Sequence, residues 1–152
     1  PDGMTTRAML VSILYRMAGE PDVSELPETP FEDVGPDAWY ADAVRWAYAN
    51  EVAAGIDDTH FAPDDRLTRA QLVTMLYRAY GPEKGVRPRP IGGYTDWNTV
   101  PEWAYPAATW AVSMGLLYGT SSSQLSPNAG ANRAQLAAFM MRTCELQSEL
   151  DA

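Results

Sequence analysis

The sequence is poor in the residues that build disulfide frameworks and many active sites. Its 152 residues include one cysteine, Cys144, and one histidine, His60. A single cysteine excludes an internal disulfide and a cysteine-based metal centre, so we expect Cys144 to be a small apolar residue of the last helix. A free thiol or a pairing with another chain are the alternatives. A single histidine, with no serine or cysteine at a recognisable nucleophile elbow, gives no pattern typical of nucleophilic catalysis.

Two further absences concern membranes and nucleic acids. No apolar run approaches the roughly 18 residues that a membrane-spanning helix needs, and no signal-peptide pattern opens the chain. Acidic residues outnumber basic ones by 20 to 11, which gives a formal net charge of −9. Such a chain lacks a basic face to neutralise phosphates, so we expect no membrane insertion and no nucleic-acid binding. Apolar residues still make up 46% of the chain, enough to bury a core.

One segment of the sequence occurs three times. Eleven of the first 19 residues recur 62 residues later, so that Thr6-Arg7-Ala8 returns as Thr68-Arg69-Ala70. A weaker copy lies 64 residues further on and contains Asn132-Arg133-Ala134-Gln135. Recurrence at a nearly fixed period indicates that the fold is built from similar units.

A second segment precedes the later two copies. Trp39, Ala43, Trp46-Ala47 and Gly55 return 64 residues later as Trp103, Ala107, Trp110-Ala111 and Gly119. The first copy has no such opening, so we expect a truncation upstream of Pro1. We also expect the apolar segment from Leu10 to Met17 to lack the first helix that would cover it. The alternatives are that another chain covers it by self-association, that residues 143–152 fold back onto it, or that a missing segment of the parent protein did so.

Each complete unit is predicted to contain two helices. Tyr40, Ala43, Val44 and Ala47 lie at the spacing of one helix face, and this helix is expected to end near Gly55 in a left-handed cap. A second helix is predicted to begin at Thr68, where Gln71 completes a capping box. No segment shows sustained alternation of apolar and polar residues, so the predicted fold class is all-α.

The repeats and the proline-rich stretches between them divide the chain. We predict the second half of a first motif at 1–19, a linker at 20–30 and a second motif at 31–81. A linker at 82–93, a third and divergent motif at 94–143 and a C-terminal helical tail at 144–152 follow.

The arginine at each predicted second-helix start is the first candidate for a binding residue. The partial positive charge of a helix N-terminus favours acidic residues. The positive charges of Arg7, Arg69 and Arg133 at such positions are therefore unfavourable unless an anionic partner compensates them. Exposed amides, the helix dipole and a guanidinium together suit a carboxylate or phosphate ligand. A salt bridge to Asp33 or Asp96 is the alternative, and the two are compatible.

Tryptophans and acidic residues are further candidates for binding residues. Trp39 and Trp103, at the starts of the first helices, either stack on a sugar or fill the core, and core packing is the favoured interpretation. Core packing is also expected for Trp46 and Trp110. The acidic run 57–60 becomes Ser121-Ser122-Ser123-Gln124 in the third copy, so we expect a solvated turn and no metal site.

Taken together, these motifs resemble the S-layer homology (SLH) family. The resemblance rests on Phe31-Glu32-Asp33-Val34, Trp39-Tyr40, Trp46-Ala47, Phe61-Ala62-Pro63-Asp64 and Leu67-Thr68-Arg69-Ala70-Gln71. It covers the latter half of one motif, one near-ideal motif and one divergent motif.

The resemblance implies a fold and a function. Tandem motifs of this family assemble in a pseudo-threefold arrangement around a central helical bundle. They hold bacterial surface proteins non-covalently at the cell wall, outside the cell, by binding an anionic and often pyruvylated secondary cell-wall polysaccharide in grooves between motifs. The expected glycan-binding residues are Arg7, Arg69, Arg133, Thr68, Gln71, Trp39, Trp103, Asp33 and Gly55.

The sequence departs from the family pattern at several positions. The acid that ends the family's Thr-Arg-Ala-Glu signature is replaced by Met9, Gln71 and Gln135, and Asn132 replaces the threonine of the third copy. The third copy also opens with Asp96-Trp97 in place of Asp-Val and has Ala104 where the second has Tyr40. We therefore expect the Arg133 groove to be degenerate. Neither catalysis nor a cofactor is expected, and an oligomerisation module without glycan binding is the alternative function.

Overall fold

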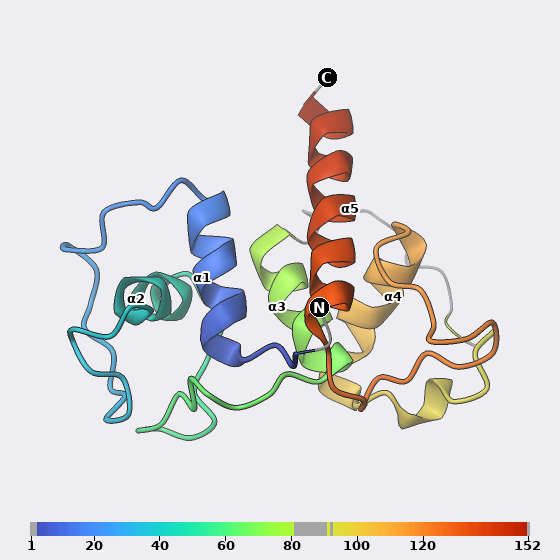
Figure 1. Cartoon of the computed structure of the whole chain (residues 1–152), viewed down its shortest axis with the longest axis horizontal. Helices are drawn as coiled ribbons and strands as arrows, with labels where there is room; N and C mark the ends of the chain where they lie inside the picture. The colour runs from blue at the N-terminus through green and yellow to red at the C-terminus, as the bar shows by residue number, and fades with distance from the viewer. Residues whose placement is uncertain (1–2, 81–90, 92, 152) are drawn as a thin grey trace. The chain divides into compact units, whose positions relative to one another are not determined.

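The structure is a computed structural model that describes residues 3–80, 91 and 93–151, and over these residues it is helical. The helices are α1 (Arg7–Met17), α2 (Ala41–Ala49), α3 (Arg69–Tyr80), α4 (Tyr105–Ser113) and α5 (Arg133–Asp151), with short 3-10 turns η1 (Trp97–Thr99) and η2 (Glu102–Ala104) before α4 (Figure 1). Extended residues before the second helices form isolated bridges, and the described ranges contain no strand. The all-α prediction is confirmed. Apart from residues 91 and 93, the predicted linker 82–93 lies outside the described residues.

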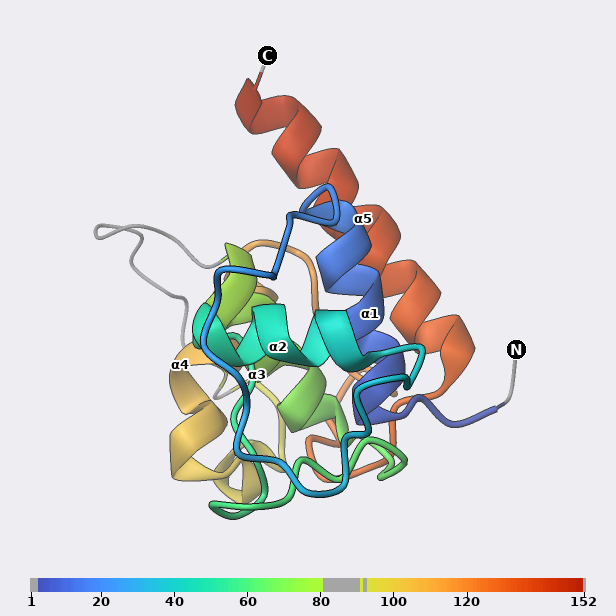
Figure 2. The same cartoon turned by 90° about the vertical axis from the view of Figure 1, so that its left-hand side faces the viewer.

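The chain forms two compact units that are offset by half a repeat from the sequence motifs. The α1/α2 unit comprises residues 6–66, and the second unit, which contains α3, α4 and α5, comprises residues 1–5 and 67–152. In the first unit α1 packs on α2, which Figure 1 shows nearly end-on and Figure 2 from the side. In the second unit α3 packs on α4. The second helix of one motif is thus covered by the first helix of the next motif.

This offset explains how the apolar face of α1 is covered. Leu10, Val11 and Leu14 are completely buried. Burial of each side chain contributes about 1.5–3 kcal/mol. The expectation that Leu10 to Met17 lacks a covering helix is wrong, because α2 of the next motif packs on α1.

The end of α2 also differs from the prediction. The helix ends at Ala49 and the left-handed residue after it is Glu51, with φ 57°, not Gly55. Gly55 serves a different purpose, since a Cβ atom there would lie 2.5 Å from the Phe31 ring and 2.5 Å from the Asp57 carbonyl oxygen. Glycine is therefore required at this position by close packing of the loop against an aromatic ring.

Helix α5 runs without a break to Asp151, so the predicted tail at 144–152 continues the second helix of the third motif. Its buried side includes Leu136 and Phe139, whereas Met141 is 59% exposed and Cys144 is also exposed. Cys144 lies in the last helix, as expected, and its side chain is exposed there. The pseudo-threefold arrangement of the motifs stays a prediction. None of the described helices has the length and apolarity needed to cross a membrane.

Candidate functional site

The starts of the second helices have the predicted caps. The Thr68 amide donates to Gln71 Oε1 at 2.9 Å, and the Gln71 amide donates to Thr68 Oγ1 at 3.1 Å. Asn132 and Gln135 form the same reciprocal pair at 3.0 and 2.8 Å. The capping box is confirmed, and the side chains of Thr68 and Gln71 are held within it.

The amides at these helix starts are engaged by main-chain carbonyls. The Arg7 amide donates to the Asp65 carbonyl at 3.0 Å and the Ala8 amide to the Pro63 carbonyl at 2.9 Å. The corresponding amides of α3 donate to carbonyls of the loop before α5. Exposed amides for an anion were expected here, and for the starts of α1 and α3 that expectation is wrong.

The arginines at these positions are buried and bind the loop of the following motif. The Arg7 side chain is 7% exposed, and its Nε and Nη2 donate to the carbonyls of Phe61 and Ala54 at 2.8 and 2.6 Å. Arg69 is 4% exposed and contacts Leu125 and Tyr118 in the same way, at 3.1 and 2.5 Å. Each guanidinium therefore fastens a second helix to the next motif's loop.

The third arginine of the series lies in a different setting. Arg133 is exposed at the start of α5, and its amide donates to the Gly3 carbonyl at 2.8 Å. Among the three arginines at second-helix starts, it is the one whose side chain is open to solvent.

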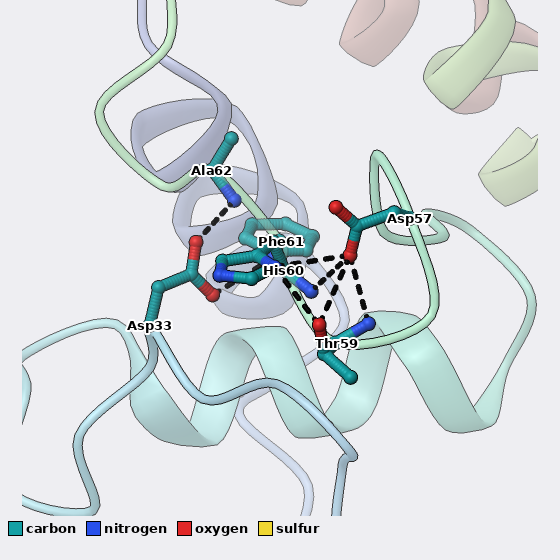
Figure 3. Close-up of polar contacts among 6 residues, drawn as sticks. All are labelled: Asp33, Asp57, Thr59, His60, Phe61 and Ala62. Carbon is teal, nitrogen blue, oxygen red and sulfur yellow. Dashed lines mark hydrogen bonds and ion pairs between the residues drawn. The ribbon is translucent and has the colours of Figure 1, made fainter.

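The acids that were candidates for salt bridges bind main-chain amides. Asp33 Oδ1 accepts from the Phe61 amide at 2.9 Å and Oδ2 from the Ala62 amide at 2.7 Å, an arrangement that we call the Asp33 clamp (Figure 3). Asp96 holds Leu125 and Ser126 in the same way, at 2.8 and 2.9 Å.

These amide contacts lower the pKa of both acids. Burial opposes ionisation of Asp33, but the amides of Phe61 and Ala62 keep its pKa below the usual value. The Leu125 amide is the main cause of the lowered pKa of Asp96; burial opposes it, and the Ser126 amide and the charge of Arg69 contribute further. Both carboxylates are therefore structural anions that fix the loops containing the arginine acceptors.

The acidic loop is organised around Asp57. Its Oδ1 accepts from the amides of Thr59 and His60, both at 2.8 Å, and lies 3.1 Å from His60 Nδ1 (Figure 3). The hydrogen bond to Asp57 and its negative charge raise the pKa of His60. These contacts are those of an exposed turn, which agrees with the prediction of a solvated loop.

The tryptophans divide into a buried and an exposed pair. Trp46 and Trp110 are 9% and 4% exposed, as predicted for core residues in mid-helix. Trp39 and Trp103 are 67% and 55% exposed, so the favoured interpretation of core packing is wrong for them. Both exposed tryptophans occupy equivalent positions, just before the first helices of the second and third motifs.

A cleft of about 300 Å³ lies beside Trp39 within the α1/α2 unit. It is lined by residues from α1, from the segment after it and from the start of α2: Ser12, Tyr15, Arg16, Glu20, Trp39, Asp42 and Ala43. Since α1 belongs to the first motif and α2 to the second, this is a groove between motifs. Of its lining only Trp39 was predicted, although the recurrence of Tyr15-Arg16 as Tyr77-Arg78 was a signal in the sequence.

Comparison with known proteins identifies these repeats. The family model described as the S-layer homology domain matches residues 30–73 and 93–137, which together make up more than half of the chain. The chain belongs to the S-layer homology domain family. This membership indicates location at the cell surface or cell wall.

Several relatives contain a similar SLH region within a much longer protein. The chain is 31% identical to an endoglucanase of a Bacillus species over 93% of its own length and 15% of that protein's. It is 34% identical to the surface-layer 125 kDa protein of Lysinibacillus sphaericus, over 76% of the chain and 10% of the relative. For a cellulosome-anchoring protein of Acetivibrio thermocellus the identity is 24%, over 95% of the chain and 33% of the relative. The chain thus spans a third or less of the length of these relatives.

Proposed function

We propose that this SLH chain anchors a larger surface protein to the bacterial cell wall by binding an anionic, for example pyruvylated, secondary cell-wall polysaccharide in grooves between motifs. The observation that carries the proposal is the cleft between α1 and α2, where Trp39 stands 67% exposed. An indole face of this kind stacks on the apolar face of a sugar ring, and buried contacts of an aromatic ring dominate many interfaces. Trp103 offers the same surface at the equivalent position of the next motif.

The relatives support an anchoring role. One is named a cellulosome-anchoring protein and another a surface-layer protein, while the endoglucanase resembles the chain over only 15% of its own length. A segment shared by proteins of such different names is expected to supply a common location and not a common reaction. We therefore propose that this chain does not itself catalyse a reaction.

We propose different roles for the three arginines at the starts of the second helices. Arg7 and Arg69 are positioning residues, because their guanidinium groups hold the loops that follow the first helices. The anionic group of the polysaccharide is proposed to pair with an exposed guanidinium, for which Arg133 at the start of α5 is the candidate. This assigns to the third motif a binding role that its divergent sequence did not favour.

Sedimentation with cell walls tests the proposal. Purified walls that retain their secondary polysaccharide, and the same walls after its extraction, are mixed with the full chain and centrifuged. We expect binding to the intact walls only, and loss of most of it in the double variant Trp39→Ala, Trp103→Ala. Trp97→Ala is the matched control, because Trp97 is also exposed, at 44%, but lies in η1 and corresponds to Val34 in the second motif, not to a second tryptophan.

Two results would contradict glycan-mediated anchoring. One is equal binding to intact and extracted walls, and the other is equal loss of binding in the control and in the double variant. Light scattering with and without polysaccharide separates the alternative function, since an oligomerisation module would associate in the absence of glycan.

A further inference from the structure

A second cleft, of about 250 Å³, lies within the second motif, between the segment that precedes α2 and the first two turns of that helix. We call it the Phe31 cleft. Its volume lies below the roughly 300–1,000 Å³ of pockets that enclose drug-sized ligands. A single small group therefore fits it better than a run of sugar rings.

The apolar part of the lining is held in place by other rings. Phe31 is 6% exposed, and its ring centroid lies 5.2 Å from that of Tyr48 and 5.5 Å from that of Phe61. Val34 lines the cleft beside it. A lining fixed in this way loses little conformational entropy when an apolar side chain enters.

The charged part of the lining contains both signs. Arg45 Nε donates to the carbonyls of Leu26 and Pro27 at 3.1 and 3.3 Å, and its Nη2 also donates to Leu26. These contacts fix the guanidinium and leave further N–H groups for a ligand. Glu28 and Asp42 line the same cleft, and neither carboxylate makes a hydrogen bond or an ion pair within the described part of the chain.

This combination of charges disfavours ions of a single sign. A simple anion would meet the carboxylates of Glu28 and Asp42, and a simple cation would meet the guanidinium of Arg45. A group that carries an ammonium and a carboxylate on the same carbon can satisfy both, because each of its charges has an opposite charge in the lining.

We infer that the Phe31 cleft binds the zwitterionic group of an amino acid. The ammonium pairs with Glu28 and Asp42, the carboxylate pairs with Arg45, and an apolar side chain lies against Phe31 and Val34. This inference goes beyond the proposed binding of polysaccharide, because the cleft lies within one motif and its ligand is not a sugar. Free amino acids carry this group, and so do uncrosslinked stem peptides of peptidoglycan that end in a diamino acid.

Three ligands with one side chain provide the probes: leucine, N-acetylleucine and leucinamide. Each is titrated into the full chain at pH 6, below the α-amino pKa of about 8, so that they are a zwitterion, an anion and a cation. The Val34 methyl and Arg45 Nε–H resonances are followed by NMR, since these residues do not line the cleft beside Trp39. We expect saturable shifts with leucine and a dissociation constant about two- to fivefold larger for each derivative, the effect of one solvent-accessible ion pair.

A pair of charge variants tests the ammonium contacts. Glu28→Gln, Asp42→Asn should weaken leucine binding to about the level of N-acetylleucine. Asp58→Asn, Glu145→Gln changes the net charge equally at exposed positions outside the cleft and should leave leucine binding unchanged. The carboxylate contact is tested with leucinamide because replacement of Arg45 would also release the segment that it holds.

A second pair of variants tests the location of the site. A Cβ atom at Gly35, which lines the cleft, would meet nothing within 4 Å, so Gly35→Phe should fold normally and obstruct the cleft. Gly93→Phe is the control, since Gly93 is equally open and lies outside the cleft. We expect leucine binding to be lost in the first variant alone, with the circular dichroism of both unchanged.

The outcomes that overturn the inference are distinct from those that concern anchoring. Absence of a saturable shift with leucine, equal affinity for all three ligands, or unchanged leucine binding in Glu28→Gln, Asp42→Asn would each overturn it, whether or not the chain sediments with intact walls. A soluble uncrosslinked stem peptide with a free diamino-acid end identifies the source. Binding at least as tight as that of leucine supports the wall as the source, and binding of leucine alone supports free amino acids.

Discussion

Replacement of Asp33 by alanine should destabilise the α1/α2 unit by about 2–4 kcal/mol. The Asp33 clamp makes two hydrogen bonds to a carboxylate, at 2.9 and 2.7 Å. Each such bond contributes about 1.5–3 kcal/mol, and their sum is reduced because Asp33 is half-buried and water can replace part of what is lost. The clamp also holds Ala62 at φ 57°, a conformation that costs about 1–2 kcal/mol for a residue other than glycine.

Hydrogen–deuterium exchange followed by mass spectrometry is the appropriate assay, because it reports on each unit separately. A loss of 2–4 kcal/mol corresponds to exchange faster by about 30- to 1,000-fold in peptides covering residues 54–66. Peptides covering residues 119–130, which the equivalent Asp96 holds, should be unchanged. Asp37→Ala removes an exposed carboxylate from the same segment and should change the stability by less than about 0.5 kcal/mol.

The pH dependence provides a second measurement of the same clamp. The pKa of Asp33 is lowered in the folded protein, so its contribution is present above the ordinary aspartate pKa of about 4 and is lost as the pH falls through the folded value. The difference in stability between wild type and Asp33→Ala should therefore shrink on acidification. The reasoning is refuted if the variant exchanges at the wild-type rate at neutral pH, or if its deficit does not shrink as the pH is lowered below the ordinary aspartate pKa of about 4.

Two further predictions concern the loops of the same unit. Glu51→Gly should raise the free energy of unfolding by about 0.5–1 kcal/mol in urea denaturation, because relief of the strain at φ 57° exceeds the added entropy of the unfolded chain; Gly115 already occupies the equivalent position at φ 70°. A loss of stability would show that the Glu51 side chain contributes more than its backbone strain costs. NMR titration should give His60 a pKa above 6.5 that returns towards 6.5 in Asp57→Asn, while Asp58→Asn changes it little. The stabilisation from protonated His60 is present below about pH 6.5 and lost as the pH rises through the folded pKa, and a His60 pKa unaffected by Asp57→Asn would contradict this account.

Apart from the end of α2, the features that depend on near neighbours in the chain were predicted correctly. The capping boxes at Thr68 and Asn132 join residues three positions apart, and their chemistry is readable from the residue types. The buried face of α2 follows from its helical spacing in the same way. The recurrence of these local patterns was also sufficient to indicate the family.

Features that depend on how successive motifs pack on one another could be seen only in the tertiary structure. The sequence shows that Arg7 and Arg69 recur, but their acceptors lie 47 to 56 residues away, in the loop of the following motif. Trp39 precedes α2 and Trp46 lies within it, and packing of α2 on α1 leaves the second buried and the first exposed beside a cleft. The sequence by itself determined the helices, their caps and the repeat, because these are local. The half-repeat offset, which buries the arginines and opens the cleft, arises from packing between distant segments and is therefore seen only in the folded chain.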